Sequence, residues 1–95
     1  MIIETLTGRL ADGVDEDAFL EADRRVQQEF VPNQAGFVRR TTARGPGERD
    51  WLVLTFWYSD DAADHSARLA KVDAVASAFL TMLEGAATQR YETLD

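Results

Sequence analysis

The feature that most constrains the fold is an apolar run, Trp51-Leu-Val-Leu-Thr-Phe-Trp-Tyr58, which is followed by an alanine-rich segment. Side chains alternate between the two faces of a β-strand, and both alternating sets of this run are largely apolar. A strand of this kind belongs in a sheet that is buried on both faces. A chain of 95 residues is too short to supply helices for both. We therefore predict that a second copy of the chain covers the remaining face, giving a homodimer.

Length and composition bound the class of protein. We predict one domain that spans residues 1–95. The chain has no cysteine, which excludes disulfides and cysteine-rich zinc sites and favours a cytoplasmic location. It has no run as apolar as a membrane span and no signal-peptide pattern, so we expect a soluble protein. The net charge of -7 disfavours binding to nucleic acid or to an anionic membrane.

The first half of the chain predicts a strand, a helix and a hairpin. Residues 2–7 alternate and are rich in β-branched side chains, which is typical of a strand. Asp15 is a suitable N-cap for a helix, whose apolar residues recur at helical spacing as far as Pro32. Residues 37–44 predict the second strand, and a Gly45-Pro-Gly47 turn joins it to the strand at residues 51–58.

The second half predicts helix and a last strand. Ser59 or Asp60 caps the helical segment, and Lys71 and Asp73 indicate either a kink or a break into two helices. Gly85 is predicted to end the helix, and residues 88–94 to form the strand. One helical stripe has mostly larger side chains, namely His65, Leu69, Val72, Ala76, Phe79 and Leu83. An adjacent stripe is small, namely Ala63, Ala67, Ala70, Ala74 and Ala78.

The resulting order, β-α-β-β-α-β, predicts an α+β, ferredoxin-like fold. In this fold a four-stranded antiparallel sheet carries both helices on one face and leaves the other face bare. Because the third strand is apolar on both sides, we expect that bare face to be covered in the assembled protein.

Three local patterns resemble a known family: the acid-capped first helix, the Gly36-Phe-Val38 start of the second strand, and Trp57-x-Ser59 at the end of the third. They are similar to the dimeric α/β-barrel superfamily, in particular its antibiotic-biosynthesis-monooxygenase-like branch. The resemblance covers essentially the whole chain. It implies two subunits that press their sheets together into a barrel, each with a ligand cavity between its own sheet and helices.

The family includes quinone-forming monooxygenases that use no metal or cofactor, haem-degrading enzymes and small isomerases. The haem-degrading members rely on an Asn of the first strand, whereas the only Asn of this chain is Asn33, after the first helix. Their triad is therefore missing. Many monooxygenase-like members have a His early in the second helix, and His65 lies close to that place. A neutral His there can accept or remove a phenolic proton; the alternative is a histidine at the edge of the core.

The resemblance also places Trp57 on the helix side of the sheet, as a cavity wall, although an aromatic residue there is equally suited to core packing. Arg39 and Arg40 are adjacent, so one of them points to each face, either as an anchor for a ligand oxyanion or toward solvent at an edge. We predict as substrate-binding residues Trp57, Arg39, Thr55, Val53 and Phe79, with His65 as the catalytic residue.

The sequence contains no phosphate-binding glycine loop and no dinucleotide fingerprint. A single His without any Cys argues against a metal site, so we expect neither metal nor cofactor. We predict a cofactor-independent, monooxygenase-like oxidoreductase that acts on a small aromatic or polyphenolic metabolite. The alternative is a dimer of the same fold that is structural or binds a small hydrophobic molecule without catalysis.

Overall fold

The computed structural model describes residues 1–94. Its strands and α-helices are β1 (Ile2–Leu10), α1 (Glu16–Arg25), β2 (Phe37–Arg44), β3 (Asp50–Trp57), α2 (Asp60–Ala70), α3 (Ala74–Leu80) and β4 (Leu83–Glu92). Between α1 and β2 the chain continues through a π-helical turn, η1 (Val26–Phe30), and a 3-10 turn, η2 (Val31–Asn33).

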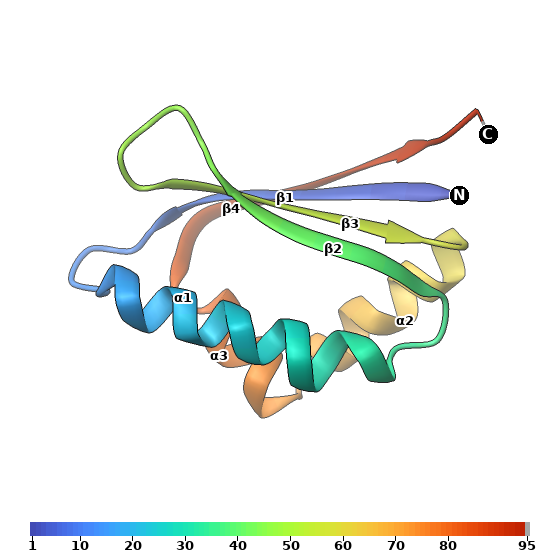
Figure 1. The fold of residues 1–95 in the computed structure, drawn as a ribbon, viewed down its shortest axis with the longest axis horizontal. Helices are drawn as coiled ribbons and strands as arrows, with labels where there is room; N and C mark the ends of the chain where they lie inside the picture. The colour runs from blue at the N-terminus through green and yellow to red at the C-terminus, as the bar shows by residue number, and fades with distance from the viewer. Residues whose placement is uncertain (95) are drawn as a thin grey trace.

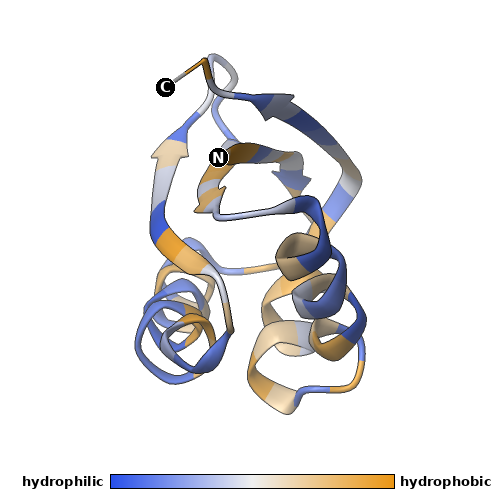
Figure 2. Ribbon diagram, turned by 90° about the vertical axis from the view of Figure 1, so that its right-hand side faces the viewer, coloured by the Kyte–Doolittle hydropathy of each residue, from blue (hydrophilic) through white to orange (hydrophobic). Residues whose placement is uncertain are grey.

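The four strands form one antiparallel sheet in the order β2-β3-β1-β4. All the helices lie on one face of this sheet (Figure 1). Seen from the side, the sheet curves over two helical groups (Figure 2). The predicted ferredoxin-like fold is therefore confirmed. No helix within residues 1–94 is long and apolar enough to cross a membrane.

Side-chain caps fix where the helices begin. Asp15 caps α1 and Ser59 caps α2, as expected from their short polar side chains. The carboxylate of Asp73 accepts the backbone N–H groups of Val75 and Ala76 at 3.0 and 2.9 Å. Because Asp73 starts a new helix, the second helical segment is broken into α2 and α3 rather than kinked.

The hydrophobic core lies between the sheet and the pair α1 and α3. The side chain of Phe19 is completely buried, and its ring lies 4.9 Å from the ring of Trp51 and 5.1 Å from that of Phe79. Leu10, at the end of β1, is also fully buried in this cluster. We call this region the packed end of the helix–sheet layer.

The predicted boundary between the last helix and the last strand was wrong. α3 ends at Leu80 and β4 begins at Leu83, so Gly85 lies inside the strand with a φ of 63°. A glycine with positive φ is common after a helix, but β-bulges use the same conformation. The pairing of β1 with β4 shifts between Thr7 and Arg9, which is the irregularity nearest to Gly85.

The predicted stripe of larger residues is not the buried side of α2. His65 and Leu69 are exposed, whereas the buried residues of α2 are Ala63 and Ser66. The break at Asp73 explains the difference, since helix positions before and after it do not share one continuous stripe. The small residues of α2 therefore face the sheet.

Candidate functional site

The strand register decides which residues face the helices. In β3 the helix-facing side chains are Trp51, Val53, Thr55 and Trp57, and all four are buried. The alternate residues Leu52, Leu54 and Phe56 are partly buried and point to the opposite side, which we call the outer face. Trp57 is thus on the helix side, as the resemblance implied.

A polar row crosses the helix-facing side with one residue from each strand. Thr55 of β3 is in register with Arg40 of β2 and with Glu4 of β1. Glu4 is in turn in register with Arg90 of β4. We call these four side chains the polar row. It lies next to Trp57, which is in register with Ile2.

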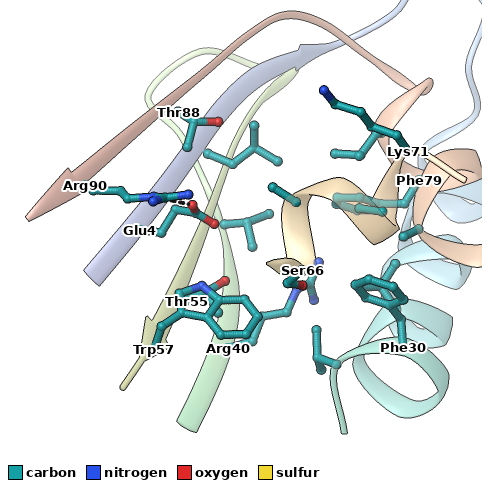
Figure 3. A pocket seen from close by; sticks show the side chains of 18 residues that line it. Glu4, Phe30, Arg40, Thr55, Trp57, Ser66, Lys71, Phe79, Thr88 and Arg90 are labelled. Atoms are coloured by element: carbon teal, nitrogen blue, oxygen red, sulfur yellow. Dashed lines mark hydrogen bonds and ion pairs between the residues drawn. The ribbon is translucent and has the colours of Figure 1, made fainter. Parts of the chain in front are cut away.

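A cavity of about 420 Å³ lies between the polar row and the helices. Figure 3 shows the side chains that line it. All four residues of the polar row line it, together with Trp57 and Val53. The helical side of the lining includes Ser66, Ala67, Ala70, Phe30 and Phe79. Its volume and its largely apolar walls with a few polar groups are typical of a site for a small organic molecule.

Arg90 joins the sheet to α2 beside this cavity. Its Nε donates to Glu4 at 2.9 Å, and its Nη1 donates to Asp64 at 2.7 Å and to Asp60 at 3.3 Å. Burial alone would lower the pKa of Arg90. The hydrogen bonds to Asp64 and Glu4 raise it by more than burial lowers it, so the net shift of this pKa is upward. Within residues 1–94 no three His, Cys, Asp or Glu side chains are grouped so as to hold a metal ion.

Arg40 is the buried cation of the site, since only 4% of its side chain is exposed. Its Nη2 lies 2.8 Å from Oδ1 of Asp23 on α1, and its Nη1 donates to Oε1 of Gln27 at 3.4 Å. The guanidinium also lies over the ring of Phe79, 5.2 Å from its centroid. Asp23 is held in turn by Thr42, whose hydroxyl donates to the same carboxylate at 2.7 Å.

Trp57 lies at the floor of the cavity beside Thr55 (Figure 3). It is 3% exposed, and its ring meets that of Phe37 edge to face with centroids 5.9 Å apart. Among the described residues 1–94, no group accepts a hydrogen bond from its buried Nε1. Buried N–H groups nearly always have a partner, so this donor is the unusual feature of the site.

Four of the predicted substrate-binding residues, Trp57, Thr55, Val53 and Phe79, line the cavity. Arg39 does not, because it is in register with Phe56 on the outer face and is exposed. The exposed His65 is also outside the cavity lining. Ligand contact by any of these residues stays a prediction.

A β-bulge explains why Arg40, and not Arg39, points inward. Phe37 is in register with Trp57 on the helix side, and Arg39 is in register with Phe56 on the other. Val38 is the extra residue between them, which reverses the alternation along the strand. The adjacent arginines do point to opposite faces, as predicted, but the sequence alone does not indicate where the bulge occurs.

Sequence reasoning chose Arg39 over Arg40 as the anchor, and it did not select Glu4, Arg90 or Ser66 as site residues. Glu4 and Arg90 each have a position in an alternating strand pattern, which places them on a face once the register is known. Ser66 belongs to neither of the two helical stripes that the sequence predicted. The missing information was therefore register and helix phase rather than residue type.

No protein-family profile and no curated protein sequence matches the chain. Solved structures do resemble it. A variant of SnoaB, a cofactor-independent oxygenase from Streptomyces nogalater, matches with a TM-score of 0.80 and 16% identity over 99% of this chain and 93% of that one. A conserved protein from Methanosarcina mazei matches with a TM-score of 0.76 and 11% identity over 96% of this chain and 91% of that one.

A third structure is that of MhuD, a heme-degrader from Mycobacterium tuberculosis with two hemes bound in its active site. Its TM-score is 0.69 and its identity 20%, over 99% of this chain and 96% of that one. Identities this low concern the fold and not the reaction. This chain therefore has the ferredoxin-like fold of the antibiotic-biosynthesis-monooxygenase-like proteins, as its sequence motifs predicted.

Proposed function

We propose that this protein is a cofactor-independent, monooxygenase-like enzyme that acts on a small aromatic or polyphenolic compound. The observation that carries the proposal is the unpartnered, buried Nε1 of Trp57, a residue that lines the cavity. A phenol or ketone oxygen of a bound ligand would accept this hydrogen bond. The ring faces of Trp57 and Phe79 and the apolar walls suit a flat aromatic body.

The chemistry requires little from the protein beyond binding and proton removal. A phenol that loses its proton becomes an electron-rich anion, which can reduce O2 directly. In the overall reaction the phenol and O2 give a quinone and water, so that one oxygen atom enters the product and no external reductant is consumed. The protein's part is to hold the ring, remove the proton and stabilise the anion in an apolar cavity.

Two residues are candidates for the base. His65, implied by the resemblance, lies on α2 one residue from Ser66 of the lining, but its own side chain is exposed. Glu4 lines the cavity directly, although its carboxylate accepts from Arg90. We retain His65 as the predicted base and treat Glu4 as its competitor.

The exposed position of His65 favours a second function, in which the cavity binds an aromatic molecule without catalysis.

Measuring O2 consumption with an O2 electrode separates the two functions. We expect some member of a panel of phenols and hydroquinones to increase O2 consumption with the wild-type protein above the rate without protein. His65→Ala and Glu4→Gln identify the base, since only loss of the true base abolishes the added rate.

Trp57→Phe keeps the ring but removes the N–H donor, and we expect it to lower turnover by at least about tenfold, the loss of one hydrogen bond to a charged oxygen. Turnover that is unchanged in Trp57→Phe would contradict the assigned role. Binding of several phenols without O2 consumption would instead support the non-catalytic function.

We also propose that the protein is a homodimer that pairs the outer faces of two sheets. One row of this face runs from Phe56 of β3 through Ile3 of β1 to Tyr91 of β4, and no helix within residues 1–94 lies over it (Figure 1). Phe56 and Ile3 are only partly buried, and Tyr91 is 52% exposed. An apolar surface of this kind indicates an interface.

Sedimentation at micromolar concentration tests the dimer. We expect the wild type to sediment as two subunits, and Phe56→Glu to sediment as one, because a carboxylate would be buried without a partner. A single wild-type subunit at this concentration would contradict the proposal. The cytoplasmic location stays a prediction from the absence of cysteine.

A further inference from the structure

Arg40 is held inside the cavity by residues that leave part of its hydrogen-bonding capacity unused. The side chain is 4% exposed, and it enters from β2 beneath the helices, where Figure 3 shows it close to Ser66. Asp23 and Gln27, four residues apart on α1 and η1, hold its two terminal nitrogens. The guanidinium thus has a fixed position at one side of the cavity.

A guanidinium has five N–H groups, and only the terminal nitrogens of Arg40 have acceptors within residues 1–94. Its Nε has none there. This nitrogen is not among the fully buried, unpartnered atoms of residues 1–94, so water can reach it, and a ligand that displaces this water must supply an acceptor. The ring of Phe79, over which the guanidinium lies, supplies no acceptor of this kind. A ligand oxygen would complete the coordination of this cation.

The charges already present at Arg40 favour one kind of ligand oxygen over another. Asp23 already neutralises Arg40, and its carboxylate is fixed by the hydroxyl of Thr42. A ligand carboxylate would stay ionised beside a guanidinium that Asp23 already pairs, and desolvating such a permanent charge in a largely apolar site is costly. A phenol or ketone oxygen brings no such charge. It can still become an anion partway through a reaction, when the guanidinium would stabilise it.

We propose that Arg40 binds the phenolic or carbonyl oxygen of the aromatic ligand and stabilises the phenolate, and that Asp23 and Gln27 act as positioning residues for it. This inference rests on the proposed function, because it assigns a substrate class to the same cavity. It adds a cationic contact to the hydrogen bond expected from Trp57. The ligand that it implies is a neutral phenol or ketone, not an aromatic carboxylate.

The test uses para-nitrophenol, whose two protonation states absorb differently, with the full-length protein under nitrogen. A nearby cation favours the ionised form, whereas burial and the carboxylate of Asp23 disfavour it, so we expect the pKa of the bound phenol to be lower in the wild type than in Arg40→Met. Arg40→Met should reduce the ratio of bound phenolate to bound phenol by about tenfold, which corresponds to one pKa unit. The affinity for the methyl ether, para-nitroanisole, should change by less than about twofold, since its oxygen cannot ionise.

Arg44→Met is the matched control. Arg44 lies on the same strand and face as Arg40, also pairs with an acid of α1, Glu16, and also lies over an aromatic ring, that of Trp51. It does not line the cavity. We therefore expect Arg44→Met to leave both the phenol spectrum and the anisole affinity unchanged.

Arg40→Met leaves the carboxylate of Asp23 without its cation, which could destabilise the fold. The double variant Arg40→Met/Asp23→Asn removes both charges and therefore serves as a second test that does not carry this unpaired charge. An identical spectrum of bound phenol in the wild type, Arg40→Met and the double variant would overturn the inference, and so would an equal loss of phenol and anisole binding. If neither ligand binds the wild type, the proposed function fails as well. Phenol binding that persists without any spectral change removes only the role of Arg40.

Discussion

The packed end around Phe19 and the cavity end above Thr55 rest on the same sheet, yet only one of them is filled. Each end has a large aromatic residue on β3, Trp51 at the packed end and Trp57 at the cavity end. At the packed end the helices bring Phe19 against the strand residue, with ring centroids 4.9 Å apart. Above the cavity, α2 presents mainly small side chains.

The comparison shows that the cavity is made by the helices and not by the strands. Three lining residues of α2, namely Ser66, Ala67 and Ala70, do not fill the space above a strand surface of ordinary size. The break at Asp73 then allows α3 to return to the sheet with Phe79. A helix of similar length with larger residues would have closed the site, because protein interiors otherwise pack densely.

The largest expected effect is at the packed end. Phe19→Ala should lower the free energy of unfolding by about 3–5 kcal/mol, since it removes a fully buried ring. Phe30→Ala at the cavity should cost clearly less, because one side of that ring already faces open space. Denaturant unfolding of the two variants measures the difference. Equal losses would contradict the distinction between the two ends.

A pair of enlargements within α2 tests the boundary of the cavity. Ala63 is 1% exposed and does not line the cavity, so Ala63→Leu should cost about 1–3 kcal/mol through overpacking. Ala70 lines it, and Ala70→Leu should cost little stability but weaken phenol binding, because the new side chain occupies the site. Chemical denaturation and ligand titration are the two measurements. Unchanged phenol binding in Ala70→Leu would contradict this boundary of the cavity.

The start of α3 should matter less than either packing change. Asp73→Ala removes the acceptor of two backbone N–H groups and should cost about 0.5–2 kcal/mol. Asp73→Asn retains a side-chain oxygen and serves as the matched control, with a smaller loss. Urea midpoints compare the three proteins. A loss of the same size in both variants would mean that the carboxylate charge, rather than the cap geometry, stabilises α3.

The smallest effects concern exposed ion pairs on α1 and η1. Hydrogen bonds from Arg24 and Arg25 lower the pKa values of Glu21 and Glu29, respectively. A carboxylate with a lowered folded-state pKa stabilises the fold above its unfolded pKa, and this contribution is lost as the pH falls through the folded pKa. NMR titration should show both pKa values below those of an unfolded peptide. Arg24→Gln should raise the pKa of Glu21 toward the value in an unfolded peptide, because it removes the main cause of the lowering.

Local chemistry made much of the fold predictable. Asp15 and Ser59 were recognisable as caps, and residues 37–44 were delimited by flanking turns, because each of these signals acts over a few neighbouring residues. The last strand was misplaced because Gly85 is equally suited to a helix end and a bulge. The order β-α-β-β-α-β tolerated that error, since it depends on the identity of the elements and not on their ends.

The site was less predictable because it depends on interactions between distant segments. Trp57, Thr55 and Val53 follow from one strand's alternation once a face is chosen. Arg40, and not Arg39, enters the cavity only because of a bulge whose position is set by pairing with β3.

The outward position of His65 likewise follows from how α2 packs on the sheet, which a helical stripe broken at Asp73 does not reveal.

The two tryptophans provide the most direct test of the claim that the cavity is a ligand site. The chain has one at each end of the helix–sheet layer, so a proton–nitrogen NMR spectrum contains two indole signals, which Trp51→Phe assigns. During titration with phenol under nitrogen, the account predicts that the Trp57 signal shifts to saturation while the Trp51 signal stays in place. A stationary Trp57 signal at ligand saturation, or equal shifts of both signals, would contradict it.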